Sequence, residues 1–385
     1  MYRRMARAAG GRAELPGATY LAVSRHATYL ASLDRLDLSG LDRLLRQYPT
    51  QTLGSLLRNV SVPAEEFLPL AARYGPSEAE RVIDESGADE RLKAFLADAE
   101  VQRCFTVQRD KARAALTAYL RQKGFFEQAE VGLVDIGWKG SIQDNLYRAA
   151  RHAPDCPRVH GLYFGLMPNP ADDLPGATKA GWLADTRRGD YPECVVLRNG
   201  PVFEMFASAP HGGVVGYAPR RPGGPLRAVI RTEDVERRNV QRYARAVFAG
   251  IEAYMREYLE VRPLLPGWAA DWKPDIVEQL RRYILYPTRA EARRFLEYSH
   301  AESFGVFHTT TYECRIPWRR VLLGGGPLGL PRRLIVALER QFWPESHVRR
   351  TGLPGANFVF DLLETRFAAR ALLGPVRPGP PGVVP

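Results

Sequence analysis

The stretch from Val131 to Ala150, VGLVDIGWKGSIQDNLYRAA, decides the fold that the sequence predicts. A short apolar run leads into Asp135, a turn with two glycines follows, and the rest shows helical spacing. The run EVGLVDIG therefore predicts a buried strand, and SIQDNLYRAARH predicts a helix. A second apolar run, RVHGLYFGLM (158–167), predicts another strand. Strand, helix and strand of these lengths form a β-α-β unit whose two strands are parallel.

The chain before this unit is expected to be mainly helical. Residues 18–30 predict a short strand that ends at Ser24 and Arg25, with a helix starting after it. From about residue 34 to residue 123, apolar residues recur every three or four positions, which is typical of helices packed by one face. Gly124 is expected to end the last of these helices as a C-cap.

The chain after the unit is expected to begin with short strands and to end with helices. The segment CVVLRNGPVFEMFAS (194–208) looks strand-like, with a turn at Asn199-Gly200. Residues 233–260 predict a long helix with Thr232 as its N-cap. Thr288 and Glu291 have the spacing of a capping box and predict a further helix, and another is expected near 332–343.

The predicted fold class is therefore α/β: a parallel β-α-β core sheet with an N-terminal helical region and C-terminal helices. We expect an α/β domain over 18–225 with a helical insertion over about 34–123, and a mainly helical region over 226–373. Residues 1–17 are expected to be a frayed N-terminus. The Pro- and Gly-rich residues 374–385 are expected to be disordered because they offer little to pack.

Composition restricts the class of protein and of partner. The formal net charge is +11, with 54 Lys and Arg against 43 Asp and Glu, which favours anionic partners. Codon usage in a high-GC gene also produces an excess of arginine, and the arginines of this chain are scattered. No nucleic-acid-binding signature is present. No apolar run reaches the roughly 20 residues of a membrane span. The cysteines are too widely spaced for a metal motif and predict a reducing cytoplasm: Cys104, Cys156, Cys194 and Cys314.

The turn after Asp135 is the leading candidate for a binding site. Gly137 and Gly140 allow the backbone to turn sharply and to approach a ligand. N–H groups at a helix start bind phosphate, Lys139 adds positive charge, and Ser141 can cap the helix or donate to a phosphate oxygen. Asp135 can accept from a sugar hydroxyl, hold Mg²⁺, or act as a base. The alternative is a structural corner in which the aspartate only caps a neighbouring segment. The large aromatic Trp138 in such a turn favours stacking on a ligand or on a partner.

Three further residues are candidates for chemistry. Glu204 lies among apolar residues, where a carboxylate must be paired, neutral or exposed on a half-buried strand. His211 precedes a Gly-Gly turn and can be an acid/base group or a phosphate contact, or be held by backbone contacts alone. Arg25 can clamp a phosphate or carboxylate with two hydrogen bonds, or form a structural salt bridge.

Three motifs together resemble one family. YLAVSRHA, VGLVDIGWKGSIQDNL and FEMFASAPHGGVVGY, in this order, are similar to the C-terminal region of bacterial haloacid-dehalogenase-like hydrolases that accompany surface-polysaccharide gene clusters. The resemblance runs from about residue 18 to about residue 260. It implies a cytoplasmic role in polysaccharide biosynthesis. The family's N-terminal domain carries a D-x-D nucleophile motif, and this chain lacks it, because Gly137 stands where the second aspartate would be.

The sequence therefore leads to two hypotheses of function. In the first, Asp135 to Ser141 bind a phosphorylated sugar or nucleotide-sugar, with Asp135, Glu204 and His211 as acid/base groups, Mg²⁺ on Asp135, and Arg25 as a second anion clamp. The activity would be that of a hydrolase or a phosphosugar transferase, since the turn is also similar to the phosphoribosyl-binding loop of type I phosphoribosyltransferases. In the second, the chain is a non-catalytic module that docks onto glycosyltransferases through Trp138 and its basic surface.

Overall fold

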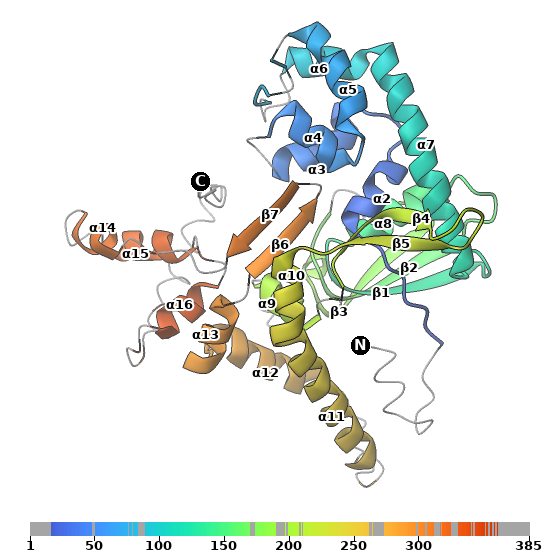
Figure 1. Ribbon diagram of the computed structural model, residues 1–385. Helices are drawn as coiled ribbons and strands as arrows, with labels where there is room; N and C mark the ends of the chain where they lie inside the picture. The colour runs from blue at the N-terminus through green and yellow to red at the C-terminus, as the bar shows by residue number, and fades with distance from the viewer. Residues whose placement is uncertain are drawn as a thin grey trace.

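A parallel three-stranded sheet forms the centre of the chain (Figure 1). The computed structural model describes residues 17–47, 51–75, 77–78, 80–83, 89–169, 174–189, 197, 199–207, 209, 211–261, 264, 273–297, 299–304, 306–311, 316, 318–324, 330–339, 341, 343–350, 352, 355, 358 and 360. The strands are β1 (Glu130–Trp138), β2 (Arg158–Leu166) and β3 (Ala177–Asp185), in the order β1-β2-β3. Both pairings are parallel, and α8 (Ser141–Ala150) connects β1 to β2. The predicted β-α-β unit and the α/β fold class are confirmed.

Helices before the sheet form the predicted helical region. They are α2 (Arg25–Ser32), α3 (Leu38–Gln47), α4 (Leu53–Val60), α5 (Ala64–Ala71), the 3-10 turn η1 (Ala72–Tyr74), α6 (Glu90–Ala97) and α7 (Ala99–Gln122). Their apolar faces enclose a core that includes the buried rings of Phe67, Phe95 and Phe105. Gly124, at φ +78°, follows the end of α7 and donates to Arg121 O, so the predicted glycine stop is confirmed.

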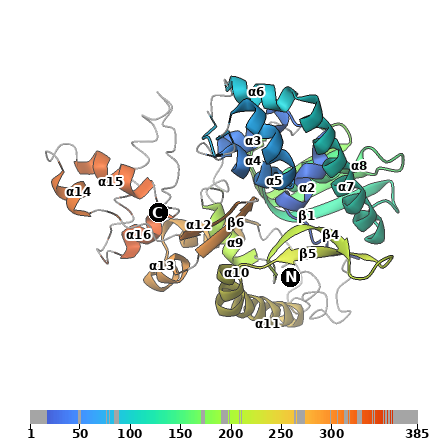
Figure 2. The same cartoon turned by 45° about the horizontal axis from the view of Figure 1, so that its top comes forward.

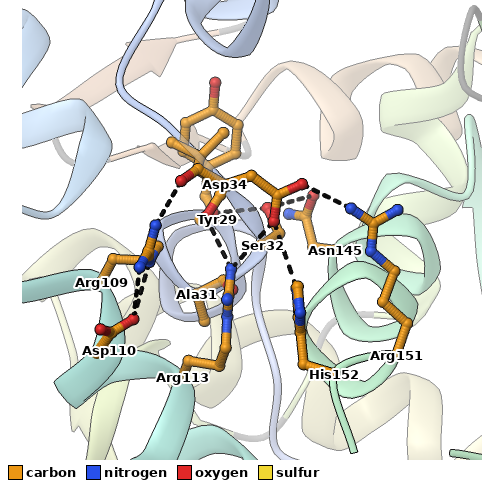
Figure 3. Close-up of polar contacts among 11 residues, drawn as sticks. Tyr29, Ala31, Ser32, Asp34, Arg109, Asp110, Arg113, Asn145, Arg151 and His152 are labelled. Carbon is orange, nitrogen blue, oxygen red and sulfur yellow. Dashed lines mark hydrogen bonds and ion pairs between the residues drawn. The ribbon is translucent and has the colours of Figure 1, made fainter. Parts of the chain in front are cut away.

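One carboxylate joins this helical region to the sheet. Asp34 follows α2, and its carboxylate lies 2.6 Å from Arg151 Nη2, 3.3 Å from His152 Nε2 and 3.5 Å from Arg113 Nη2 (Figure 3). Arg113, from α7, also donates to Ala31 O at 2.9 Å and so binds the C-terminal end of α2. Burial, followed by the positive charge of Arg113, lowers the pKa of His152, so Arg113 and Arg151 are the cations that neutralise Asp34 near neutral pH.

The first turn of α8 is bound to the sheet by buried polar side chains. Gln143 Nε2 donates to Thr178 O at 2.9 Å and to Val159 O at 3.3 Å, and its Oε1 accepts from Tyr163. Asp144 lies 2.8 Å from Lys179 Nζ, and the two side chains are only 4% and 2% exposed. The strands and the helix are therefore joined by specific polar contacts as well as by apolar packing.

The chain after the sheet begins beside it, and its helices α14 and α15 lie far from it (Figure 2). Its elements are η2 (Thr186–Arg188), α9 (Gly200–Ala207), β4 (Gly213–Pro219), β5 (Leu226–Arg231), α10 (Asp234–Asn239), the π-helical turn η4 (Val240–Ala244), α11 (Arg245–Val261), α12 (Lys273–Leu285), α13 (Arg289–Leu296), β6 (Ser299–Phe304), β7 (Val306–Thr311), α14 (Trp318–Leu323), α15 (Leu330–Glu339) and α16 (Pro344–Arg350). Strands β4 and β5 form one antiparallel pair, and β6 and β7 form another. In the described part of the chain, no helix is both long and apolar enough to cross a membrane.

Two predicted strands differ from the structure, and residues 194–196, 198 and 208 of the second lie outside the described residues. Residues 17–24 have no regular structure, because tyrosine hydroxyls bind the main chain there in place of a neighbouring strand: Ala22 N donates to Tyr119 and Ala22 O accepts from Tyr217. The segment predicted to continue as a strand after Gly200 is helix α9. Proline is favoured in the first turn of a helix, and the short apolar run after Pro201 fits either period, so packing decided the outcome.

Other boundaries follow the predictions more closely. The capping box of Thr288 and Glu291 starts α13 as expected, and a helix lies near residues 332–343. Glu233, rather than Thr232, is the N-cap of α10, because it forms a reciprocal capping box with Glu236. The region expected to be mainly helical also contains the β6–β7 hairpin. Residues 1–16 of the predicted frayed N-terminus (1–17) and the predicted disordered tail lie outside the described residues.

The buried ion pair under α8 makes a prediction about stability. Lys179→Met should lower the free energy of unfolding by about 3–5 kcal/mol, because it leaves the buried Asp144 carboxylate without its cation. Urea unfolding followed by circular dichroism measures the change. Lys93→Met is the matched control: its pair with Glu90, at 2.7 Å, is exposed, and its loss should cost less than about 1 kcal/mol. Equal costs for the two variants would contradict the structural role of the buried pair.

Candidate functional site

Two carboxyl groups lie near the carboxyl end of β1. Asp135 lies three residues before the end of β1, and Glu204 is in α9, which lies against β1. The two groups are close enough for the charge of Glu204 to raise the pKa of Asp135. The structure therefore brings together two of the three residues that the sequence proposed as acid/base groups.

The Asp135 side chain is accessible to solvent and yet crowded by protein. Desolvation by the surrounding atoms is the largest cause that raises its pKa, and the nearby Glu204 charge raises it further. Opposing them, Ile136 N donates to Asp135 Oδ1 at 2.8 Å, which favours the ionised form. The net result is a carboxyl group that holds its proton to a higher pH than an ordinary aspartate.

Trp138 positions the second carboxyl group. Its Nε1 donates to Glu204 Oε1 at 2.9 Å, and its ring centroid lies 6.0 Å from that of Phe203. A Cβ atom on Gly200 would lie 3.0 Å from the indole, so the ring fits closely against the start of α9. The predicted role of Trp138 was stacking on a ligand, but the structure gives the half-buried ring a packing role and an orienting hydrogen bond.

The glycines of the turn are required by packing. Gly137 has φ +131°, and a Cβ atom there would lie 2.0 Å from Gly165 O on β2. Gly140 has φ +62°, and its Cβ atom would lie 2.9 Å from Cδ of the buried Lys179. Both positions are therefore closed to other residues whether or not a ligand binds. This outcome supports the structural alternative for the glycines, which the sequence left open.

The start of α8 keeps one property of an anion site. Gly140 is the N-cap, so the expectation that Ser141 caps the helix is wrong; Ser141 is the first helical residue and is buried. No side chain caps the first N–H groups of α8. Lys139 is exposed directly before the cap, and the first-turn carboxylate of Asp144 is neutralised by Lys179. The local charge at this helix start is therefore positive.

Hydrogen bonds near the start of α2 connect the first motif, YLAVSRHA, to the third motif, FEMFASAPHGGVVGY. Ser24 Oγ, at the N-cap of α2, donates to Val214 O at 2.6 Å. His211 Nδ1 lies 2.8 Å from Gly212 O and its Nε2 lies 2.6 Å from Tyr20 OH. Because a carbonyl only accepts, these partners assign the proton of a neutral imidazole to Nδ1 and let Nε2 accept from the tyrosine. These described contacts of His211 are not with the carboxyl pair, so its catalytic role stays a prediction.

Arg25 is the first residue of α2 and is half-buried. Its neighbour Ser24 accepts from Ala27 N at 3.0 Å and so begins the helix. Arg25 therefore lies at the start of α2, where Ser24 joins the first motif to Val214 of the third. Its role as an anion clamp stays a prediction.

The carboxyl pair provides two of the ligands that a metal ion needs. Within the described ranges, no group of three or more His, Cys, Asp or Glu side chains is arranged to hold a metal ion. Mg²⁺ is commonly bound through one or two carboxylates together with phosphate oxygens of a substrate. Asp135 and Glu204 fit that pattern only with a phosphorylated ligand present, and the Mg²⁺ site stays a prediction.

Sequence reasoning missed the residues that support the site. The helix at Glu204 was signalled by Gly200-Pro201, since glycine and proline often precede or begin a helix. The positioning role of Trp138 had no sequence signal, because the contact joins residues 66 positions apart. The polar run Gln143-Asp144-Asn145 in an otherwise apolar unit was visible, and all three side chains are buried.

Compared with models of known protein families and with curated proteins, the sequence matches none. The function of the chain is therefore inferred from its own geometry.

Glu204→Gln should lower the pKa of Asp135, because it removes the nearby negative charge that helps to raise it. The shift should be partial, since desolvation is the larger cause. Carboxyl chemical shifts followed by NMR during a pH titration measure it. Glu130→Gln, at the opposite end of the same strand, is the matched control and should leave the titration of Asp135 unchanged. An unchanged pKa in Glu204→Gln would show that the two groups do not interact.

Asp135→Asn should stabilise the fold at neutral pH. The folded-state pKa of Asp135 lies above its unfolded value, so the folded state binds the proton more tightly and stability falls as pH rises between these two values. The gain from the substitution should therefore be full above the folded pKa and should disappear below the usual range of aspartate. Urea unfolding of both proteins from pH 3 to pH 8 tests this, and a gain that does not change with pH would contradict it.

Proposed function

We propose that the chain binds a phosphorylated sugar or nucleotide-sugar at the carboxyl end of β1 and acts on it with Asp135 and Glu204. The observation that carries this proposal is the placement of Asp135 near the carboxyl end of β1 and of Glu204 on α9, which lies against that strand and bonds to its Trp138. Ligands of open α/β sheets bind at the carboxyl ends of the strands, where these groups lie. Perturbed carboxyl pairs are common at catalytic and binding sites.

The two carboxyl groups have different surroundings and so suit different roles. Asp135 is accessible and holds its proton to a higher pH, which suits a group that gives a proton to a leaving oxygen. Glu204 is oriented by Trp138 and presents a carboxyl oxygen that can accept from a sugar hydroxyl or from water. Two carboxyl groups in different environments are the usual basis for separate acid and base roles.

The phosphate of the ligand is assigned to the start of α8. Its first N–H groups have no side-chain cap, and Lys139 lies exposed beside them. Oriented N–H groups and the positive end of the helix dipole favour an anion there. If Mg²⁺ takes part, Asp135 and Glu204 would hold it as carboxylates and it would supply positive charge for the phosphate, in place of the proton-donor role of Asp135.

The resemblance to the C-terminal region of haloacid-dehalogenase-like proteins supports a place in surface-polysaccharide biosynthesis in the bacterial cytoplasm. An aspartyl-phosphate mechanism of that family is not part of the proposal, because the D-x-D motif is missing from this chain. The alternative is a non-catalytic module that docks onto glycosyltransferases through Trp138 and the basic surface. Packing of the Trp138 ring against Phe203 and Gly200 weighs against it, whereas the contacts of His211 with Tyr20 and Gly212, rather than with the carboxyl pair, favour it.

Binding experiments with phosphosugars and nucleotide-sugars, with and without Mg²⁺, test the proposal. Isothermal titration should show binding to the wild-type chain, and Asp135→Asn and Glu204→Gln should each weaken it by roughly tenfold or more, as expected when a hydrogen bond to a charged group is lost. Lys139→Ala should weaken phosphorylated ligands more than the matching free sugars.

Glu130→Gln and Lys93→Met are the controls, since both residues are exposed and distant in the fold from the carboxyl pair. Both should bind as the wild type does. A wild-type chain that binds no member of the panel, or variants that bind as well as the wild type, would overturn the proposed function.

A further inference from the structure

The segment over residues 315–338 combines arginine with apolar residues and contains no acidic residue. Its charged residues are all arginines: Arg315, Arg319, Arg320, Arg332 and Arg333. The remaining residues are apolar, glycine or proline. Arginine together with leucine, valine and tryptophan is typical of helices that lie in the interface of a membrane, whereas helices inside a protein core carry few charges. The burial of these side chains in the structure separates the two cases.

Helices α14 and α15 come from this segment and are held to the fold by buried apolar side chains. Val321 of α14 and Leu338 of α15 are both 6% exposed, and Leu338 belongs to the same buried cluster as Val348 of α16. Arg333 Nε donates to Val321 O at 2.9 Å and so joins α15 to the main chain of α14. We call these two helices the α14–α15 pair. Two residue steps turn a helix by about 200°, so residues two positions away from Val321 and Leu338 face outward.

The outward side of each helix carries arginine beside an exposed apolar side chain. Leu323 follows Arg319 and Arg320 by four and three residues, so these three side chains lie on one side of α14. Leu323 is 79% exposed, and both arginines are exposed. On α15, Arg332 and Val336 are four residues apart on one side of the helix, and both are exposed. We call these five residues the outward surface of the α14–α15 pair.

The arginines of the outward surface form no ion pair with any residue that the structure describes. By contrast, Arg282 on α12 is paired with Glu291 at 2.7 Å. Three positive charges without a partner in the described chain favour binding to an anionic partner. Leu323 beside them favours a partner that also offers an apolar region, because an apolar side chain gains free energy when it leaves water.

A membrane surface with anionic lipids offers both features together. Its headgroups attract Arg319, Arg320 and Arg332, and the boundary of its acyl chains accepts Leu323 and Val336. Arginine side chains are long enough to reach the headgroups while the leucine enters below them. Nucleic acid is also anionic, but its affinity for such a surface would come from phosphate contacts alone. The exposed leucine therefore favours the lipid surface.

The α14–α15 pair lies where a flat surface can reach it. In both views it is at the edge of the molecule, away from the β1–β2–β3 sheet (Figures 1 and 2). Helix α14 has 6 residues and α15 has 10, so they are about 9 Å and about 15 Å long. Both are too short for the roughly 30 Å apolar core of a bilayer. These helices can therefore lie on a membrane but cannot cross it.

We propose that the α14–α15 pair binds the surface of a membrane that contains anionic lipids. Arg319, Arg320 and Arg332 contact the headgroups, and Leu323 and Val336 enter the upper part of the acyl region. Few apolar side chains take part, so the binding is reversible and weakens as salt screens the arginines. This inference is independent of the proposed function at the carboxyl end of β1.

Sedimentation of the full chain with lipid vesicles tests the proposal. The chain should bind vesicles of phosphatidylcholine mixed with phosphatidylglycerol, should bind far less to phosphatidylcholine alone, and should be released by salt. The double variant Arg319→Gln, Arg320→Gln should lower the partition coefficient by roughly 25-fold, since each arginine near an anionic surface contributes about fivefold. The matched control is Arg220→Gln, Arg221→Gln, which removes the same charge from exposed positions between β4 and β5 and should bind almost as the wild type does.

Leu323→Gln separates a lipid surface from other anionic partners, because it leaves the charge unchanged. It should lower vesicle binding by roughly tenfold through the loss of one inserted apolar side chain. Leu264→Gln, at a residue that is 74% exposed outside the pair, is its control and should bind as the wild type does. Circular dichroism should show every variant folded.

Three results would each overturn the proposal: a wild type that does not sediment with anionic vesicles, an arginine variant that binds as its control does, or Leu323→Gln binding as Leu264→Gln does. The last result, together with binding of a DNA duplex that depends on the same arginines, would assign the outward surface to nucleic acid instead.

Discussion

The buried first turn of α8 is the constraint on which the rest of the structure depends. Three consecutive polar residues each reach a different partner: Gln143 the main chain of β2 and β3, Asp144 the ammonium of Lys179, and Asn145 the hydroxyl of Thr28 on α2. Buried polar groups are costly when unpaired, so all of these partners must be in place together. The sheet, the connecting helix and the first helix of the helical region are therefore oriented as one unit.

This constraint also explains the turn between β1 and α8. The start of α8 is pulled onto the sheet, so the chain must reverse closely over Gly165 and Lys179, and only glycine fits at positions 137 and 140. Features that the sequence suggested for ligand binding are thus partly accounted for by packing. The chemistry is left to the groups next to the turn, which are Asp135 at the end of the strand and the uncapped N–H groups of α8.

The second carboxyl group reaches the site through tertiary packing. Helix α9 lies against β1 because Val202, Phe203 and Met205 are buried. Glu204, between Phe203 and Met205, accepts a hydrogen bond from Trp138. An orienting hydrogen bond from an indole fixes a carboxyl group without adding a charge. None of the causes that shift the pKa of Asp135 is a cation among the described residues, and burial together with the nearby charge of Glu204 raises that pKa.

The sequence by itself determined the elements whose signals are local. The apolar runs and the helical spacing predicted β1, α8 and β2, and the capping box at Thr288 predicted the start of α13. Local patterns failed where two periods fit a short apolar run, as at α9, and where side chains replaced a strand partner, as at Ala22. Only the tertiary structure decided that Asp135 lies near Glu204 and that Trp138 is half-buried. These properties depend on contacts between residues far apart in the chain, and burial and charge at such contacts are set by the packing of the whole fold.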